Sequence, residues 1–105
     1  MVIVEQRDYH VYTGRLQELV KLYAEEGIPI QAEVLGGFVG AFTTDIGALS
    51  MYTSMWRYDS FAQREERRAL LMARDDWKAF LAKIMPLIHT QQNRILTPTS
   101  FSALQ

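Results

Sequence analysis

The stretch MYTSMWRYDSFAQREERRALL, residues 51–71, changes its pattern of side chains halfway along. Before Asp59, the aromatic residues fall on alternate positions, which is typical of a β-strand. Ser60 is followed three residues later by Gln63, and this spacing is the capping-box pattern at the start of a helix. The stretch therefore predicts a strand that passes directly into a helix across Asp59 and Ser60.

The same criteria predict three more strands and more helix in the rest of the chain. Apolar residues recur at spacings of three and four from Leu16 to Tyr23, which indicates a helix that Gly27 ends, followed by a short helical turn. Asp75 is a candidate N-cap for a later helix, and Pro86 marks its end. The predicted strands are Val2–Tyr12, Phe38–Asp45, Ser50–Tyr58 and Ile88–Leu96, and the short helical turn is Ile28–Leu35.

This order, β-α-β-β-α-β, is the ferredoxin-like α+β motif, in which four antiparallel strands carry both helical segments on one face. We expect one domain over residues 1–105. Bulky side chains occupy both alternating sets of positions in the strands, so that both faces of the sheet are apolar. A sheet with two apolar faces needs both of them covered. We therefore expect a homodimer that packs its sheets face to face.

Composition excludes several classes of protein. The formal net charge is −1, from 11 basic and 12 acidic residues, so the chain lacks the charge surplus of a protein that binds nucleic acid or anionic membranes. It has no cysteine, which excludes disulfides and thiol chemistry. No signal peptide or membrane-length apolar run is visible, and we expect a cytoplasmic protein with no membrane partner.

Three motifs resemble the NIPSNAP family, and the likeness extends in order over nearly the whole chain. They are E-x-R-x-Y at residues 5–9, W-x-Y-D-S at residues 56–60, and N-R-I-L-x-P at residues 93–98. The resemblance implies a dimeric α+β barrel, in agreement with the predicted strand order. Family members often have no defined biochemical role. They often carry histidine two residues before the tryptophan, whereas this chain has Ser54, so a mechanism that uses this imidazole does not transfer.

The polar residues of the first strand form the first candidate site. Glu5, Arg7 and Tyr9 alternate and therefore share one face of the strand. They fit two interpretations: an ion pair that fixes the dimer core, or the polar wall of a pocket. The third strand and the last strand add residue types that suit such a pocket. The full candidate set is Glu5, Arg7, Tyr9, Ser54, Trp56, Tyr58, Asn93 and Arg94.

Three functions remain open. The first is a protein that binds a small polar or aromatic molecule in this pocket. The second, by analogy with cofactor-independent monooxygenases of the same superfamily, is an oxygenase or isomerase in which Tyr9 or Glu5 handles a proton and Arg7 or Arg94 stabilises an oxyanion. The third is a structural or interaction dimer without a small-molecule site.

The remaining polar groups give weaker signals. Four arginines stand among glutamates after Ser60, and they predict a solvent-exposed helix face. His10 and His89 have no metal-ligand spacing, so we expect neither a metal nor another cofactor. The four arginines are Arg64, Arg67, Arg68 and Arg74.

Overall fold

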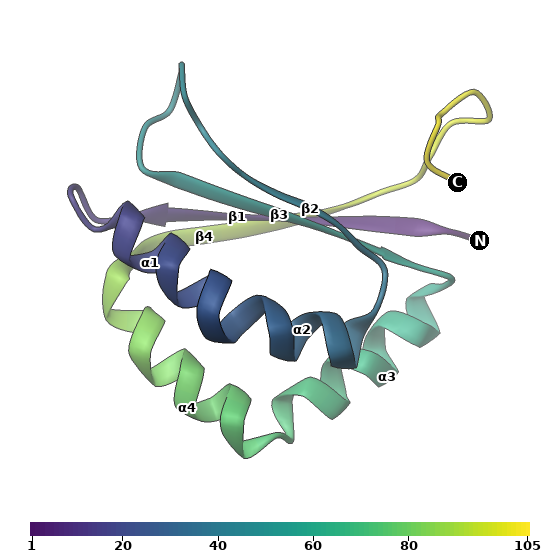
Figure 1. Cartoon of the computed structure of the whole chain (residues 1–105). Helices are drawn as coiled ribbons and strands as arrows, with labels where there is room; N and C mark the ends of the chain where they lie inside the picture. Colours follow the sequence, from purple (N-terminus) through teal and green to yellow (C-terminus); the bar gives the residue numbers. More distant parts are fainter.

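A computed structural model describes residues 1–105 and confirms the α+β architecture expected from the sequence. Four strands form one antiparallel sheet in the order β2-β3-β1-β4, and the helices all lie on one face of it (Figure 1). The strands are β1 (Ile3–Val11), β2 (Phe38–Thr43), β3 (Met51–Tyr58) and β4 (Ile88–Leu96). The helices are α1 (Leu16–Leu22), α2 (Ile28–Leu35), α3 (Phe61–Met72) and α4 (Asp75–Ile84), with a π-helical turn η1 (Tyr23–Gly27) and a 3-10 turn η2 (Met85–Leu87).

The core lies between the sheet and the helices. Strand β3 alternates strictly, so that Tyr52, Ser54, Trp56 and Tyr58 are buried and the residues between them are not. Register places Tyr9 of β1 opposite Tyr52, and directly opposed residues point to the same face of a sheet. The side chains of β1 that face the helices are therefore those at odd positions.

Gly27 does not end a helix, contrary to the sequence-based expectation. Helix α1 continues through η1 into α2 without interruption, and the backbone of Gly27 is helical, with φ −69°. A Cβ atom at Gly27 would lie 2.5 Å from Cζ of Phe80 and 2.6 Å from Cδ1 of Tyr23. Glycine is needed here because two buried aromatic rings pack against the backbone. The helix ends instead at Gly36, whose φ of +64° suits glycine.

The start of α3 agrees with the sequence, while that of α4 differs from it. Ser60 is the N-cap of α3, and its hydroxyl oxygen accepts a hydrogen bond from the backbone N–H of Gln63 at 3.0 Å. Asp75 is not the N-cap of α4, because Arg74 takes that position and Asp75 is the first helical residue. Carboxylates in the first turn still favour the helix, since the positive end of its dipole lies there.

The opposite face of the sheet has no helix on it. The loop of residues 44–50, between β2 and β3, and the C-terminal tail of residues 97–105 both project from this face (Figure 1). Large apolar side chains are exposed on this face, as Phe42 at 56%, and on the loop, as Ile46 at 92%. None of the helices combines the length and the apolar character needed to cross a lipid bilayer.

The substitution Gly27→Ala separates packing from helix propensity. Alanine in an open helix position stabilises a protein by about 0.5–1 kcal/mol over glycine. Here the added methyl group would collide with Phe80 and Tyr23, so we expect the free energy of unfolding to fall by about 1–3 kcal/mol instead. Urea denaturation measures it. In a Phe80→Leu background, where the ring is absent, the penalty of Gly27→Ala should shrink; a stabilised single variant would refute the close-packing argument.

Candidate functional site

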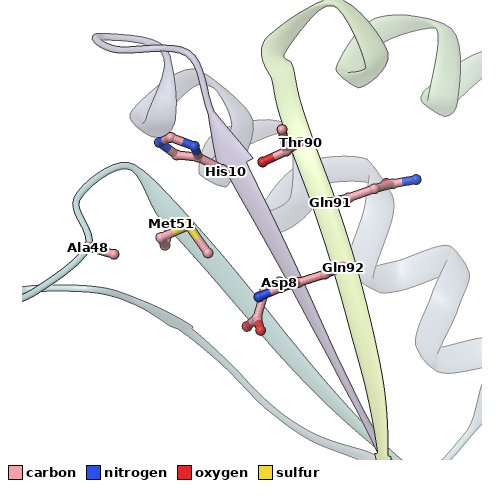
Figure 2. A pocket seen from close by; sticks show the side chains of 7 residues that line it. All are labelled: Asp8, His10, Ala48, Met51, Thr90, Gln91 and Gln92. Carbon is pink, nitrogen blue, oxygen red and sulfur yellow. The ribbon is translucent and has the colours of Figure 1, made fainter.

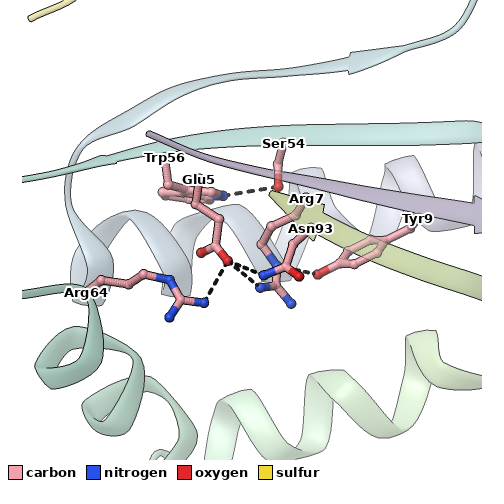
Figure 3. A network of polar contacts seen from close by, with 7 residues as sticks. All are labelled: Glu5, Arg7, Tyr9, Ser54, Trp56, Arg64 and Asn93. Carbon is pink, nitrogen blue, oxygen red and sulfur yellow. Dashed lines mark hydrogen bonds and ion pairs between the residues drawn. The ribbon is translucent and has the colours of Figure 1, made fainter. Parts of the chain in front are cut away.

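A buried carboxylate, that of Glu5, is the centre of the polar network beneath the helices. Its side chain is completely buried, and one oxygen, Oε2, accepts three hydrogen bonds (Figure 3). Arg64 Nη2 donates at 2.8 Å, Asn93 Nδ2 at 2.7 Å and Arg7 Nη1 at 3.1 Å. These donors come from α3, β4 and β1, so that one carboxylate connects three elements of the fold.

Arg7 extends the network along β1 to Tyr9. Its Nε donates a hydrogen bond to the hydroxyl oxygen of Tyr9 at 2.9 Å, and its guanidinium lies 5.7 Å from the centre of the Tyr9 ring. The strand period of two places these side chains next to each other on the same face. Arg7 is thus held at both ends, by a carboxylate and by a phenol, which fixes its orientation.

The electrostatics of the site favour an ionised Glu5. Burial alone would raise the pKa of Glu5, but hydrogen bonds from Arg64 and Asn93 and the positive charges of Arg7 and Arg64 together lower it below its ordinary value. The buried tyrosines behave differently. Burial, helped by the neighbouring Tyr9, raises the pKa of both Tyr23 and Tyr52, so these phenols stay protonated.

A cavity of about 170 Å³ lies beside this network, between the sheet and α4. An apolar cavity of about 150 Å³ is large enough for a benzene molecule. Arg7 and Tyr9 line both this cavity and an adjoining hollow of about 160 Å³ at the β4 edge, where Asn93 also lies. The mainly apolar cavity, which we refer to as the chamber, thus shares Arg7 and Tyr9 with a polar hollow.

Two buried polar groups on the chamber wall have no partner within the chain. Gln31 is 1% exposed and Trp77 is 3% exposed, yet Gln31 Oε1 and Trp77 Nε1 form no hydrogen bond. Buried polar atoms are nearly always hydrogen-bonded in native proteins, because leaving one unpaired costs about 1–3 kcal/mol.

The structure brings most of the sequence-predicted residues together, and it separates Arg94 from them. Trp56 and Ser54 lie in the same layer, where Trp56 Nε1 donates to Ser54 Oγ at 3.1 Å (Figure 3). Tyr58, on the same strand, is also buried, and its hydroxyl has no partner within the chain. Arg94 lies opposite Gln6, whereas Asn93 lies opposite Arg7. Successive residues of a strand point to opposite faces, so Arg94 points away from the helices.

Arg64 and Arg68 do not belong to a solvent-exposed helix face, which corrects the expectation for the arginine-rich segment. Arg64 pairs with Glu5 and has only 23% of its side chain exposed. Arg68 lines the chamber. A signal for this was present in the sequence: residues 64, 68 and 71 are spaced as one face of a helix, and Leu71 is an apolar residue that needs burial. Arg74 does lie at the surface, paired with Glu33 and Asp76.

A separate hollow of about 260 Å³ opens on the face of the sheet away from the helices (Figure 2). Asp8, His10 and Met51 contribute to it, and Asp8 is held there by the hydroxyl of Thr53 at 2.7 Å. None of the predicted site residues lines this hollow. His10 and His89 lie with their ring centres 5.6 Å apart, and no group of three potential metal ligands occurs in the chain.

Comparisons with known proteins agree with the architecture. The family model NIPSNAP matches residues 4–103. NipSnap homolog 1 of Danio rerio is 36% identical over 98% of this chain, and a NIPSNAP family protein of Agrobacterium tumefaciens, solved as a crystal structure, is 48% identical with a TM-score of 0.97 over 100% of both chains. The chain spans between 19% and 37% of the length of the animal relatives that it matches over 98% of its own.

A more distant likeness concerns the fold alone. A candidate antibiotic biosynthesis monooxygenase from Nitrosomonas europaea superimposes with a TM-score of 0.70, and the match covers 97% of this chain and 94% of the other. The two sequences are 7% identical. At this identity the arrangement of strands and helices is shared, and the chemistry of the site has to be argued from this chain's own residues.

The substitution Glu5→Gln tests the charge at the centre of the network. Because the folded-state pKa of Glu5 is lowered, ionised Glu5 stabilises the fold above the ordinary glutamate pKa, and this contribution is lost as pH falls through the folded-state pKa. We expect Glu5→Gln to lower the free energy of unfolding by about 3 kcal/mol at pH 7, because two partly buried arginines lose their anionic partner. Urea denaturation at several pH values from 7 to 3 measures it.

The difference between wild type and Glu5→Gln should narrow on acidification, since protonated Glu5 resembles glutamine. The control is Glu66→Gln, an exposed position on α3, where we expect a change below about 0.5 kcal/mol at every pH. A pH-independent difference at Glu5 would show that its charge does not stabilise the fold.

Proposed function

The chain belongs to the NIPSNAP family, and from this premise we propose that it is a homodimer that binds a small polar or aromatic molecule between its sheet and its helices. The observation that carries the proposal is the chamber itself. Arg7 and Tyr9 of the polar network line one part of its wall, and Gln31 and Trp77, each with a buried polar atom that has no partner within the chain, line another. A cytoplasmic location, expected from the sequence, stays a prediction.

The uncovered face of the sheet supports the dimer. Phe42 and Val39 of β2 are 56% and 40% exposed, and two more apolar side chains, Met51 and Met55, are half-buried on the same face. A contiguous apolar surface of this kind is typical of an interface. The loop of residues 44–50 and the C-terminal tail rise on either side of the face and add Leu49 and Phe101, at 66% and 88% exposure.

Binding is favoured over general acid–base catalysis by the state of the titratable groups. A general base needs a pKa near the working pH and a free lone pair directed at the substrate. Glu5 has a lowered pKa, its Oε2 already accepts three hydrogen bonds, and its Oε1, which has no partner within the chain, is buried away from solvent. Tyr23 and Tyr52 have raised pKa values and ionise only with difficulty. The network is thus better built to hold a polar group in place than to move a proton.

The dimer can be tested with a matched pair of substitutions. Phe42 lies on the uncovered face of the sheet and is 56% exposed, and Phe61 lies on α3 and is 51% exposed. We expect wild type and Phe61→Glu to have twice the mass of the chain in light scattering. We expect Phe42→Glu to shift towards the mass of one chain, because a charge would be buried in the interface. A wild type of single-chain mass would refute the dimer.

Binding in the chamber can be followed at the indole N–H signals, since the chain has two tryptophans. Trp77 lines the chamber and its Nε1 has no partner within the chain, whereas Trp56 Nε1 is already bonded to Ser54. On titration with phenol, benzyl alcohol and benzoate, we expect at least one probe to shift the NMR signal of Trp77 much more than that of Trp56. The substitution Trp77→Phe assigns the two signals.

Leu81→Phe should reduce this shift, because Leu81 lines the chamber and the larger ring would fill part of it. Its control is Leu70→Phe on the exposed side of α3, which should leave the titration unchanged. Equal small shifts of both indole signals, with no effect of Leu81→Phe, would contradict a ligand site in the chamber.

A further inference from the structure

Arg68 is the charged group that the network leaves unpaired. Arg7 and Arg64 both form ion pairs with Glu5, at 3.1 and 2.8 Å, whereas Arg68 takes part in none of the ion pairs or side-chain hydrogen bonds of the chain. Burial, and after it the positive charge of Arg7, lower the pKa of Arg68. An arginine that is partly buried, beside a like charge and without an anion, is costly to the fold.

The charge around Arg68 does not balance. Three arginines, Arg7, Arg64 and Arg68, surround one carboxylate, that of Glu5. Glu5 is also the only acidic side chain among the groups whose charge acts on Arg68. The site therefore carries a local surplus of positive charge although the whole chain has a formal net charge of −1. An anion in the chamber would neutralise part of this surplus.

The rest of the chamber wall indicates what kind of molecule would fit beside this charge. Most of the lining is apolar, with contributions from Met72, Trp77, Leu81, Ile84, Met85 and Ile88. A bare inorganic ion would leave this surface against water or empty space. A molecule with an apolar body of about the size of one aromatic ring fits the volume of about 170 Å³ and removes the apolar lining from water.

We infer that the molecule held in this chamber is an amphiphilic carboxylate, with its anionic group on Arg68 and its aromatic or short aliphatic body against α4. This inference rests on the proposed function and specifies the class of ligand. A carboxylate matches the planar guanidinium of arginine, which can donate two parallel hydrogen bonds to it. The indole N–H of Trp77 supplies a further donor on the same wall, and Gln31 Oε1 can accept from a hydroxyl or amide group of the ligand.

The experiment compares probes of one shape and different charge. Benzoate, benzamide and phenyl phosphate are titrated into the whole protein, and dissociation constants are read from the Trp77 indole signal. We expect benzoate to bind at least about 10-fold more tightly than benzamide, because a charge-assisted hydrogen bond to Arg68 is lost in the amide. Phenyl phosphate distinguishes the two sources of negative charge, and tighter binding of phenyl phosphate than of benzoate overturns the carboxylate assignment.

Variants of α3 locate the charge. Arg68→Met should weaken benzoate binding by about 10- to 100-fold and leave benzamide binding nearly unchanged. Arg67→Met, one residue away and off the chamber wall, should leave both unchanged. Arg68→Lys keeps the positive charge but lacks the planar guanidinium, and it should weaken benzoate binding by less than Arg68→Met. It replaces Arg68→Met if that variant does not fold.

The outcomes separate this inference from the proposed function. If benzamide binds as tightly as benzoate, and Arg68→Met affects neither, the carboxylate inference is overturned while small-molecule binding in the chamber stands. If no probe shifts the Trp77 signal at millimolar concentration, both are overturned.

Discussion

The buried carboxylate of Glu5 is the constraint on which the polar side of this fold depends. A charge with no exposure to water needs compensation, and here three donors on three elements supply it to Oε2, while Oε1 has no partner within the chain. Two of these partners, Arg64 and Asn93, are 59 and 88 residues away in the chain, so the carboxylate fixes α3 and β4 relative to β1. The orientation of Arg7, and through it that of the Tyr9 hydroxyl, follows from the same bond.

Local pattern was sufficient to predict the strand order, the face shared by Glu5, Arg7 and Tyr9, and the helix start at Ser60. It was not sufficient to choose between Asn93 and Arg94, because that choice depends on the register of β4 against β1, and a shift of one residue exchanges the two faces. The role of Gly27 was not predictable, because a glycine that ends a helix and a glycine that allows close packing, here against Phe80, look the same in a sequence. The contact of Arg64 with Glu5 was not predicted, because a charged helix face usually lies in water.

The sheet serves two different roles on its two faces. Towards the helices it presents aromatic rings next to the network of Glu5. The ring of Tyr52 stacks on that of Tyr23 in η1, with the ring centres 4.7 Å apart. Away from the helices it presents apolar side chains beside a polar hollow around Asp8 and His10. Because these two sets of side chains lie on opposite faces, the proposed dimer and the proposed ligand site can be tested by separate substitutions.

The contrast between Glu5 and Arg68 separates a structural role from a ligand-binding one. At Glu5, three side chains of the chain itself donate hydrogen bonds to one oxygen of the buried carboxylate. Arg68 lies close enough for its charge to act on Arg7 and Glu5, yet it is left without a bond, on the wall of a chamber that also leaves Gln31 and Trp77 unsatisfied. Three polar side chains around one space thus lack a bond within the chain, although apolar residues of similar size would fill such a space at lower cost. The proposed ligand would supply partners for them.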